Sequence, residues 1–224
     1  YRIRFATSHP KDLSNDLIYA IRDLDKVCNH LHLPIQSGSN KILKKMNRGY
    51  TREKYMDQIL NLKKECPDIA LSTDIIVGFP YETQEDFNDT MNLLREIQFD
   101  SIFAFAYSDR SSAPAAKFSQ QVVEEEKRER LNNLLELQED YTEKKNKEQI
   151  GKILDVLVEG KSGKKRDGFD HAAKNMEQMV GRTESNKIVH FPSKDVIIGD
   201  IIKIRIENAY PHSLWGHPLG VQDK

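Results

Sequence analysis

Residues 69–79 read Ile-Ala-Leu-Ser-Thr-Asp-Ile-Ile-Val-Gly-Phe, the most strand-like run in the chain. Its β-branched and aliphatic residues predict a buried strand, and Pro80 ends it because proline cannot continue a hydrogen-bonded ladder. Thr83 is suited to cap the helix that follows. Acidic residues lie in the first turn of this helix, where negative charge is stabilising. A buried strand followed at once by a helix is the repeating unit of a parallel α/β sheet.

The same unit recurs on both sides of this strand. Further strands are predicted at residues 2–8, 31–37 and 101–108, and each is followed by a helix. The predicted caps of the other helices are Ser14, Ser39 and Thr51. We therefore expect four parallel strands with right-handed crossovers. A closed eight-stranded barrel takes about 250 residues, so this region corresponds to a partial, half β/α barrel.

The pattern changes after a long charged helix predicted over about residues 122–149. Short strands joined by Gly, Asn, Asp and Pro turns follow, which is typical of a small antiparallel β-barrel. These strands are predicted at residues 153–159, 179–182, 187–191 and 201–206. The predicted organisation is a half-barrel over residues 1–150, a small barrel over residues 151–217 and a tail over residues 218–224.

Composition excludes several classes of protein. The 224 residues carry 34 Lys and Arg against 35 Asp and Glu, which argues against a uniformly basic nucleic-acid coat but allows a local basic face. No apolar run reaches the ~18 residues that span a bilayer, so no membrane partner is expected. Cys28 and Cys66 are too few for a disulfide framework, which favours a cytoplasmic location. Because Tyr1 opens directly on a predicted strand, we expect a truncated chain.

Candidate site residues follow from the predicted sheet, since ligands of parallel sheets bind at the carboxyl ends of the strands. Gln36 and Ser37 offer hydrogen-bonding groups beside Gly38, although a polar helix cap on a βα turn is the simpler explanation of these residues. His9, also at a strand end, is the best histidine candidate. His30 and His32 lie two apart and therefore point to the same face.

The predicted small barrel carries basic loops. Basic side chains gather in a hairpin-like connection and around a second turn, where they form either a phosphate-binding face or an ordinary solvated surface. They are Lys161, Lys164, Lys165, Arg166, Arg182 and Lys187.

Four motifs in order and at fixed spacing connect these observations to a known family. They are His-Leu-Pro-Ile-Gln-Ser-Gly-Ser at 32–39, Met-Asn-Arg-Gly-Tyr-Thr at 46–51, Ser-Thr-Asp-Ile-Ile-Val-Gly-Phe-Pro at 72–80 and Gly-Arg-Thr-Glu-Ser-Asn-Lys at 181–187. Over about residues 1–216 the chain resembles the methylthiotransferases of the radical S-adenosylmethionine (SAM) superfamily, most closely the MiaB type that acts on tRNA.

This resemblance implies the carboxyl-terminal half of a radical SAM barrel followed by an RNA-binding TRAM barrel. It implies addition of a methylthio group to carbon 2 of isopentenylated adenosine beside the anticodon, with SAM and two 4Fe-4S clusters as cofactors. The implied partners are the tRNA anticodon stem-loop and an amino-terminal part of the same chain. The implied SAM-binding residues are Gln36, Ser37, Asp74, Ile76 and Gly78, and the implied RNA-binding residues are the six basic residues above. The resemblance identifies no catalytic residue and no metal ligand.

The chain also departs from the family. The radical SAM cluster needs three thiolates in a Cys-x3-Cys-x2-Cys loop, whereas this sequence has only Cys28 and Cys66. We therefore expect this fragment to hold neither cluster and to be inactive by itself. Tyr81 stands where a glycine is usual.

Two other interpretations stay open. One is a sister methylthiotransferase that acts on threonylcarbamoyladenosine in tRNA or on a ribosomal protein. The other is an RNA-binding module whose half-barrel is only structural.

Overall fold

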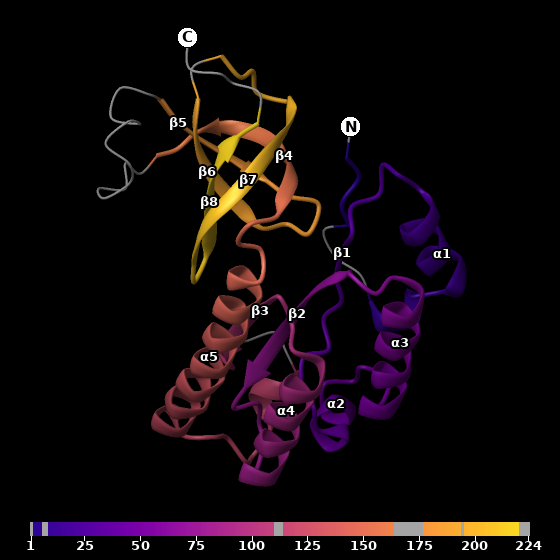
Figure 1. Cartoon of the computed structure of the whole chain (residues 1–224). Coiled ribbons are helices and arrows are strands. Elements are labelled where there is room, and N and C mark those ends of the chain that lie inside the picture. Colours follow the sequence, from indigo (N-terminus) through magenta and orange to yellow (C-terminus); the bar gives the residue numbers. More distant parts are fainter. Residues whose placement is uncertain (1, 6–8, 110–113, 164–176, 194, 220–224) are drawn as a thin grey trace. The chain divides into compact units, whose positions relative to one another are not determined.

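The computed structural model describes residues 2–5, 9–109, 114–163, 177–193 and 195–219, and the chain forms two compact units (Figure 1). The first unit comprises residues 1–141 and the second comprises residues 142–224. In the described part of the chain, none of the helices is long and apolar enough to cross a membrane.

The first unit is built on a parallel sheet with strand order β1-β2-β3. The strands are β1 (His30–His32), β2 (Ala70–Val77) and β3 (Ser101–Ala106). The predicted parallel α/β architecture is confirmed, but the described sheet has three strands rather than the predicted four. Residues 2–5 contribute only one isolated parallel bridge, between Ile3 and Val27, and residues 6–8 lie outside the described residues.

The second predicted strand is also shorter than residues 31–37. β1 ends at His32 because Pro34 has no N–H to donate to β2. Pairing resumes at a single bridge between Gln36 and Ile75, where Gln36 adopts a left-handed backbone with φ 78°.

Helices connect the strands, and the predicted caps are confirmed. The hydroxyls of Ser14, Ser39, Thr51 and Thr83 each accept a backbone N–H in the first turn of their helices. Thr83 and Asp86 form a reciprocal capping box. The helices of this region are η1 (Pro10–Asp12), α1 (Asn15–Asp23), α2 (Asn40–Lys45), α3 (Arg52–Glu65), α4 (Gln84–Ile97), η2 (Pro114–Lys117) and α5 (Glu124–Lys147).

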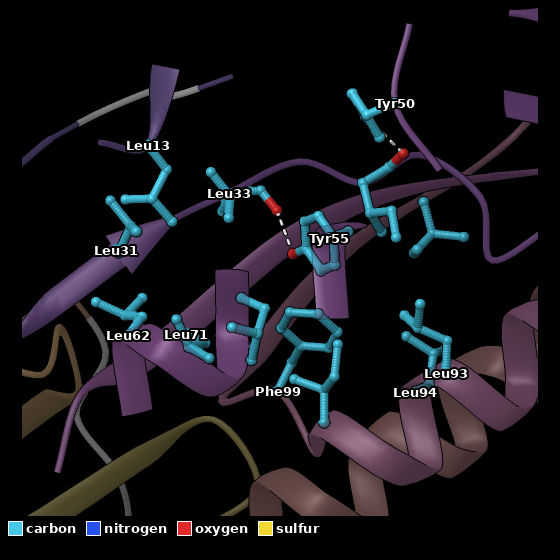
Figure 2. Close-up of a cluster of buried hydrophobic side chains, with 14 of the residues drawn as sticks. Leu13, Leu31, Leu33, Tyr50, Tyr55, Leu62, Leu71, Leu93, Leu94 and Phe99 are labelled. Carbon is cyan, nitrogen blue, oxygen red and sulfur yellow. Dashed lines mark hydrogen bonds between the residues drawn. The ribbon is translucent and has the colours of Figure 1, made fainter. Parts of the chain in front are cut away.

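The core of the first unit lies on one face of the sheet. Leu31, Leu71, Ile75 and Val77 point into it and are essentially inaccessible. Figure 2 shows Tyr55 of α3 reaching across this core, where its hydroxyl donates to the Leu33 carbonyl at 2.8 Å. Because side chains alternate along a strand, the residues between these core positions lie on the opposite face of the sheet.

The second unit is a closed five-stranded barrel with order β4-β5-β6-β8-β7. Its strands are β4 (Ile153–Lys161), β5 (Glu177–Arg182), β6 (Ile188–Ser193), β7 (Ile201–Tyr210) and β8 (Ser213–Pro218). The small barrel was predicted, but it is mixed rather than wholly antiparallel, because β6 and β8 pair in parallel. Strand β8 was not predicted, since Gly216 and Pro218 are both disfavoured in strands.

Substitution of Tyr55 tests the core. Tyr55→Phe should lower the free energy of unfolding by about 1 kcal/mol because it removes the buried hydrogen bond to Leu33, and Tyr55→Ala by about 3–5 kcal/mol because it also leaves a cavity. Leu60→Ala, on the same helix but 60% exposed, should change it by no more than about 0.5 kcal/mol. Urea denaturation measures all three. A Tyr55→Phe variant as stable as the unchanged chain would contradict this assignment.

Candidate functional site

Gln36, which follows the carboxyl end of β1, lies beside Asp74 in the middle of β2. The Gln36 N–H donates to the Asp74 carbonyl at 2.9 Å, and the Ile76 N–H donates to the Gln36 carbonyl at 2.9 Å. These two bonds continue the sheet beyond Pro34 and hold Gln36 in its left-handed conformation. Two residues that are 38 positions apart in sequence thus lie side by side.

A cavity of about 590 Å³ opens at this place. Its volume is that of a typical small-molecule site. It brings together two of the predicted site residues, Gln36 and Asp74, with polar and apolar side chains from the amino-terminal segment and the loop after α2. The lining residues are Phe5, His9, Asp12, Leu17, Pro34, Gln36, Arg48 and Asp74. Sequence reasoning missed Arg48, because it follows a helix rather than a strand.

Buried polar side chains contact the Asp74 carboxylate and each other. His32 Nε2 lies 3.4 Å from Asp74 Oδ1, and His32 Nδ1 lies 3.0 Å from Ser72 Oγ. Ser72 Oγ also lies 3.2 Å from His30 Nε2, so both histidines face the same side of the sheet, as their spacing predicts. The ring of Phe103 stands edge-on to His32. A series of polar contacts through His32, Ser72 and His30 therefore orients the Asp74 carboxylate on the face of the sheet opposite the core.

His9 contributes a neutral imidazole to the cavity. Burial lowers its pKa, and the positive charge of Arg48 lowers it further. The Lys11 N–H donates to His9 Nδ1 at 3.1 Å, which leaves the proton on Nε2, and Tyr50 packs edge-on to the ring. His9 therefore both caps η1 and lines the cavity.

Ser37 has a different environment from Gln36. Its side chain is fully buried and is not among the residues that line the cavity. Its oxygen accepts from the Ser39 N–H at 3.2 Å and lies 3.4 Å from Thr90 Oγ1. Gly38 is required between them, since a Cβ there would lie 2.5 Å from the Thr90 Cα. The structure thus shows Ser37 holding the turn that follows Gln36.

Ile76 and Gly78 lie at the end of β2. Ile76 is partly exposed on the same face as Asp74 and is opposite Phe105 in the register of β2 and β3. Gly78 has φ 70°, and a Cβ there would lie 2.3 Å from Lys127 Cγ, so both the backbone and the space demand glycine. Its N–H donates to Glu82 Oε2 at 2.6 Å.

A buried ion pair fastens this loop to α5. The side chains of Glu82 and Arg130 are 1% and 3% exposed, and Arg130 Nη1 lies 2.7 Å from Glu82 Oε2. Burial raises the pKa of Glu82 above its usual range, although the Gly78 N–H and Arg130 both act to lower it. The two residues are 48 positions apart, so sequence reasoning had no local signal for this contact.

Asp86 joins the turn that contains Ser37 to the start of α4. Its carboxylate accepts from Ser39 Oγ at 2.7 Å, from Lys41 Nζ at 2.6 Å and from the Thr83 N–H at 2.9 Å. Burial acts to raise its pKa, but the hydrogen bonds from Lys41, Ser39 and Thr83 outweigh burial and lower it to about 2.

The predicted basic residues of the barrel make local contacts where they are described. Lys161 pairs with Glu177, and Lys187 Nζ donates to Asn146 Oδ1 at 2.9 Å. Arg182 donates to Glu159 at 3.2 Å and to the carbonyl and side chain of Asn186, thereby bracing the turn between β5 and β6. The other three predicted residues, Lys164, Lys165 and Arg166, lie outside the described residues.

The thiols do not fit an iron–sulfur cluster. Within the described ranges, no group of three or more His, Cys, Asp or Glu side chains is arranged to hold a metal ion. Cys28 and Cys66 are both buried and free, and burial raises the pKa of Cys66, which disfavours the thiolate that a cluster needs.

Two segments of the chain match known protein families. Residues 1–94 match the Radical SAM superfamily, and residues 147–219 match the TRAM domain. The chain thus contains one segment similar to radical SAM proteins and, after it, one similar to TRAM domains. These two matches agree with the resemblance predicted from the four motifs.

Known proteins are similar to this chain over nearly its whole length. The tRNA-2-methylthio-N(6)-dimethylallyladenosine synthase of Acetivibrio thermocellus is 50% identical over 215 residues, which cover 96% of this chain and 43% of that protein. The proteins of the same name from Thermoanaerobacter pseudethanolicus and Clostridium botulinum are 49% identical over 98% and 97% of this chain, and over 45% and 46% of their own lengths. The chain thus spans less than half the length of these relatives.

Among solved structures, the fold is similar to that of coproporphyrinogen III oxidase (HemN) from Escherichia coli, a radical SAM enzyme. The match covers 93% of this chain and 49% of that chain, with a TM-score of 0.51 and 16% sequence identity. At this identity the likeness shows the fold alone.

The Asp86 junction predicts an acid-sensitive stability. Because the folded-state pKa is about 2 and the ordinary value is 3.8, the stabilisation is present above about pH 4 and is lost as the pH falls towards 2. Asp86→Asn should lower the free energy of unfolding at pH 7 by about 2 kcal/mol and flatten its fall between pH 4 and 2. Urea denaturation across this pH range measures both effects.

The matched control is Asp57→Asn, which replaces an exposed carboxylate on α3. The role given to Asp86 is wrong if the free energy of unfolding falls equally steeply between pH 4 and 2 in the two variants.

Proposed function

We propose that this radical SAM–TRAM chain is part of a tRNA methylthiotransferase that adds a methylthio group to carbon 2 of isopentenylated adenosine beside the anticodon. The observation that carries the proposal is the 49–50% identity, over nearly the whole chain and through both domains, to synthases named for that product. The cavity that contains Gln36 and Asp74 provides a binding site in the radical SAM part.

Within this proposal the two parts of the chain have different tasks. Residues 1–150 supply the carboxyl-terminal half of the catalytic barrel, and residues 151–217, with Pro218 at the end of β8, bind the tRNA anticodon stem-loop. The protein works in the cytoplasm. Because the described cysteines do not fit a cluster, the ligands of the two 4Fe-4S clusters come from an amino-terminal part of the full-length protein.

The cavity residues suit S-adenosylmethionine. When bound, this cofactor supplies the radical chemistry of the superfamily. The Asp74 carboxylate is a strong acceptor for ribose hydroxyls, and the Gln36 amide both donates and accepts. His32 keeps Asp74 oriented, while Ile76 offers an apolar surface for the adenine ring. Ser37 and Gly78 complete the proposed site indirectly, because Ser37 holds the turn that follows Gln36 and the Gly78 N–H binds Glu82 in the loop after β2.

Binding of the cofactor tests the radical SAM part. In the full-length enzyme, Gln36→Ala and Asp74→Asn should each weaken SAM binding about tenfold, because each removes hydrogen bonds from a desolvated site. Isothermal titration calorimetry measures the affinity. Asn88→Ala is the matched control, because Asn88 lines a separate cavity of about 400 Å³ between α4 and α5. Unchanged affinity in both site variants would contradict the proposed SAM site.

Salt-dependent tRNA binding tests the TRAM part. Lys187→Ala should weaken binding of the anticodon stem-loop and reduce the slope of log K against log salt by about 0.7–0.9, because one phosphate contact is lost. Lys187→Arg should keep most of the affinity. The control is Lys203→Ala, on strand β7, where Lys203 pairs with Asp155. Equal salt slopes for Lys187→Ala and the unchanged chain would show that the turn between β5 and β6 does not contact the RNA.

A further inference from the structure

Aromatic and basic side chains gather where the loops after β2 and β3 meet α2, and we name Lys45, Tyr81, Phe118 and Ser119 the rim patch. The Tyr81 and Phe118 rings pack edge to face, with centroids 5.6 Å apart. Lys45 Nζ lies 4.1 Å from the Tyr81 ring centroid and 5.6 Å from that of Phe118. The Tyr81 hydroxyl lies 3.1 Å from Ser119 Oγ. Three segments that are distant in sequence thus meet at one point.

The backbone of Tyr81 is strained. Its φ is 72°, a conformation that glycine adopts freely and that a tyrosine rarely adopts. The Tyr81 N–H donates to the Gln120 carbonyl at 2.8 Å, and Lys41 Nζ donates to the Tyr81 carbonyl at 2.9 Å. These bonds involve only the backbone of Tyr81, so glycine would make them equally well. The strained position therefore keeps an aromatic side chain that the backbone hydrogen bonds of the loop do not require.

The rim patch has the chemistry of a single-stranded nucleic-acid contact. Aromatic rings stack on unpaired bases, and ammonium groups bind the phosphates between them. Lys45 is exposed, as is Lys117 next to Phe118. The nearby carboxylates of Glu82 and Asp86 are already paired, with Arg130 and Lys41, so they leave the positive charge of the patch available.

The rim patch is also continuous in sequence with the candidate site. Arg48, which lines the cavity, follows Lys45 by three residues at the end of α2. Loops at the carboxyl ends of parallel strands form the side from which ligands enter. A substrate whose reacting nucleotide approaches a cofactor bound in the cavity therefore has its neighbouring nucleotides near these loops.

We propose that the rim patch binds an unpaired nucleotide of the RNA substrate that flanks the nucleotide reacting at the mouth of the cavity. The flanking base stacks against Phe118 and Tyr81, and Lys45 and Lys117 contact its backbone phosphates. This inference rests on the proposed function and adds a second RNA contact, outside the TRAM domain.

Substitutions of the rim patch test the inference through RNA affinity, measured by fluorescence anisotropy with the whole chain and an anticodon stem-loop RNA. Tyr81→Gly and Phe118→Ala should each weaken binding about tenfold, the size typical of one lost stacking contact. Lys45→Ala should reduce the slope of log K against log salt by about 0.7. Lys64→Ala, an exposed lysine in the last turn of α3, is the control and should leave both quantities unchanged.

Thermal unfolding separates binding from structure. Because Tyr81→Gly relieves the left-handed strain, its melting temperature should stay within about 3 °C of the unchanged chain while its RNA affinity falls. Lys45→Ala, which replaces an exposed side chain, provides a second variant that folds normally.

The outcomes distinguish the inference from the proposed function. If Tyr81→Gly, Phe118→Ala and Lys45→Ala keep full RNA affinity while Lys187→Ala loses it, the RNA contact proposed for the rim patch is wrong and the proposed TRAM contact stands. If the rim variants weaken binding and Lys187→Ala does not, the rim patch stands and the TRAM contact is wrong. A large fall in melting temperature with unchanged affinity would assign the rim patch a purely structural role.

Discussion

The alternation of side chains along β2 is the constraint on which the first unit depends. Leu71, Ile75 and Val77 point into the helix-covered core, whereas Asp74 and Ile76 between them lie on the opposite face. A shift of one residue in register would bury Asp74 and expose the core side chains, so packing and site geometry are specified together. Because β2 pairs with both β1 and β3, its register also places the residues of its two neighbours.

Buried ionic contacts determine the positions of the loops that follow these strands. The pair formed by Glu82 and Arg130 holds the loop after β2 against α5, and Asp86 holds the turn after Gln36 against α4. A fully buried pair such as Glu82 and Arg130 adds little net stability, but a misplaced partner is costly. These contacts therefore serve mainly to select one arrangement of the loops around the cavity, and they leave Gln36 and Asp74 available to a ligand.

Local signals in the sequence predicted the helices well and the strands less well. Ser14, Ser39, Thr51 and Thr83 cap their helices as expected, because a capping side chain bonds the backbone only two or three residues away. The fourth parallel strand reduces to one bridge at Ile3 in the described residues, and β8 was missed. Strand formation depends on a distant partner, so residues such as Gly216 join a sheet when tertiary packing supplies one.

The sequence by itself determined the α/β class, the small barrel after it and the likeness to radical SAM methylthiotransferases, because periodicity, caps and motif spacing are properties of the linear chain. Only the tertiary structure decided that Gln36 and Asp74 share a cavity with His9 and Arg48, and that Ser37 holds a buried turn. It also revealed the strained Tyr81 between Lys45 and Phe118. These are contacts between residues tens of positions apart, and they exist only once the chain has packed.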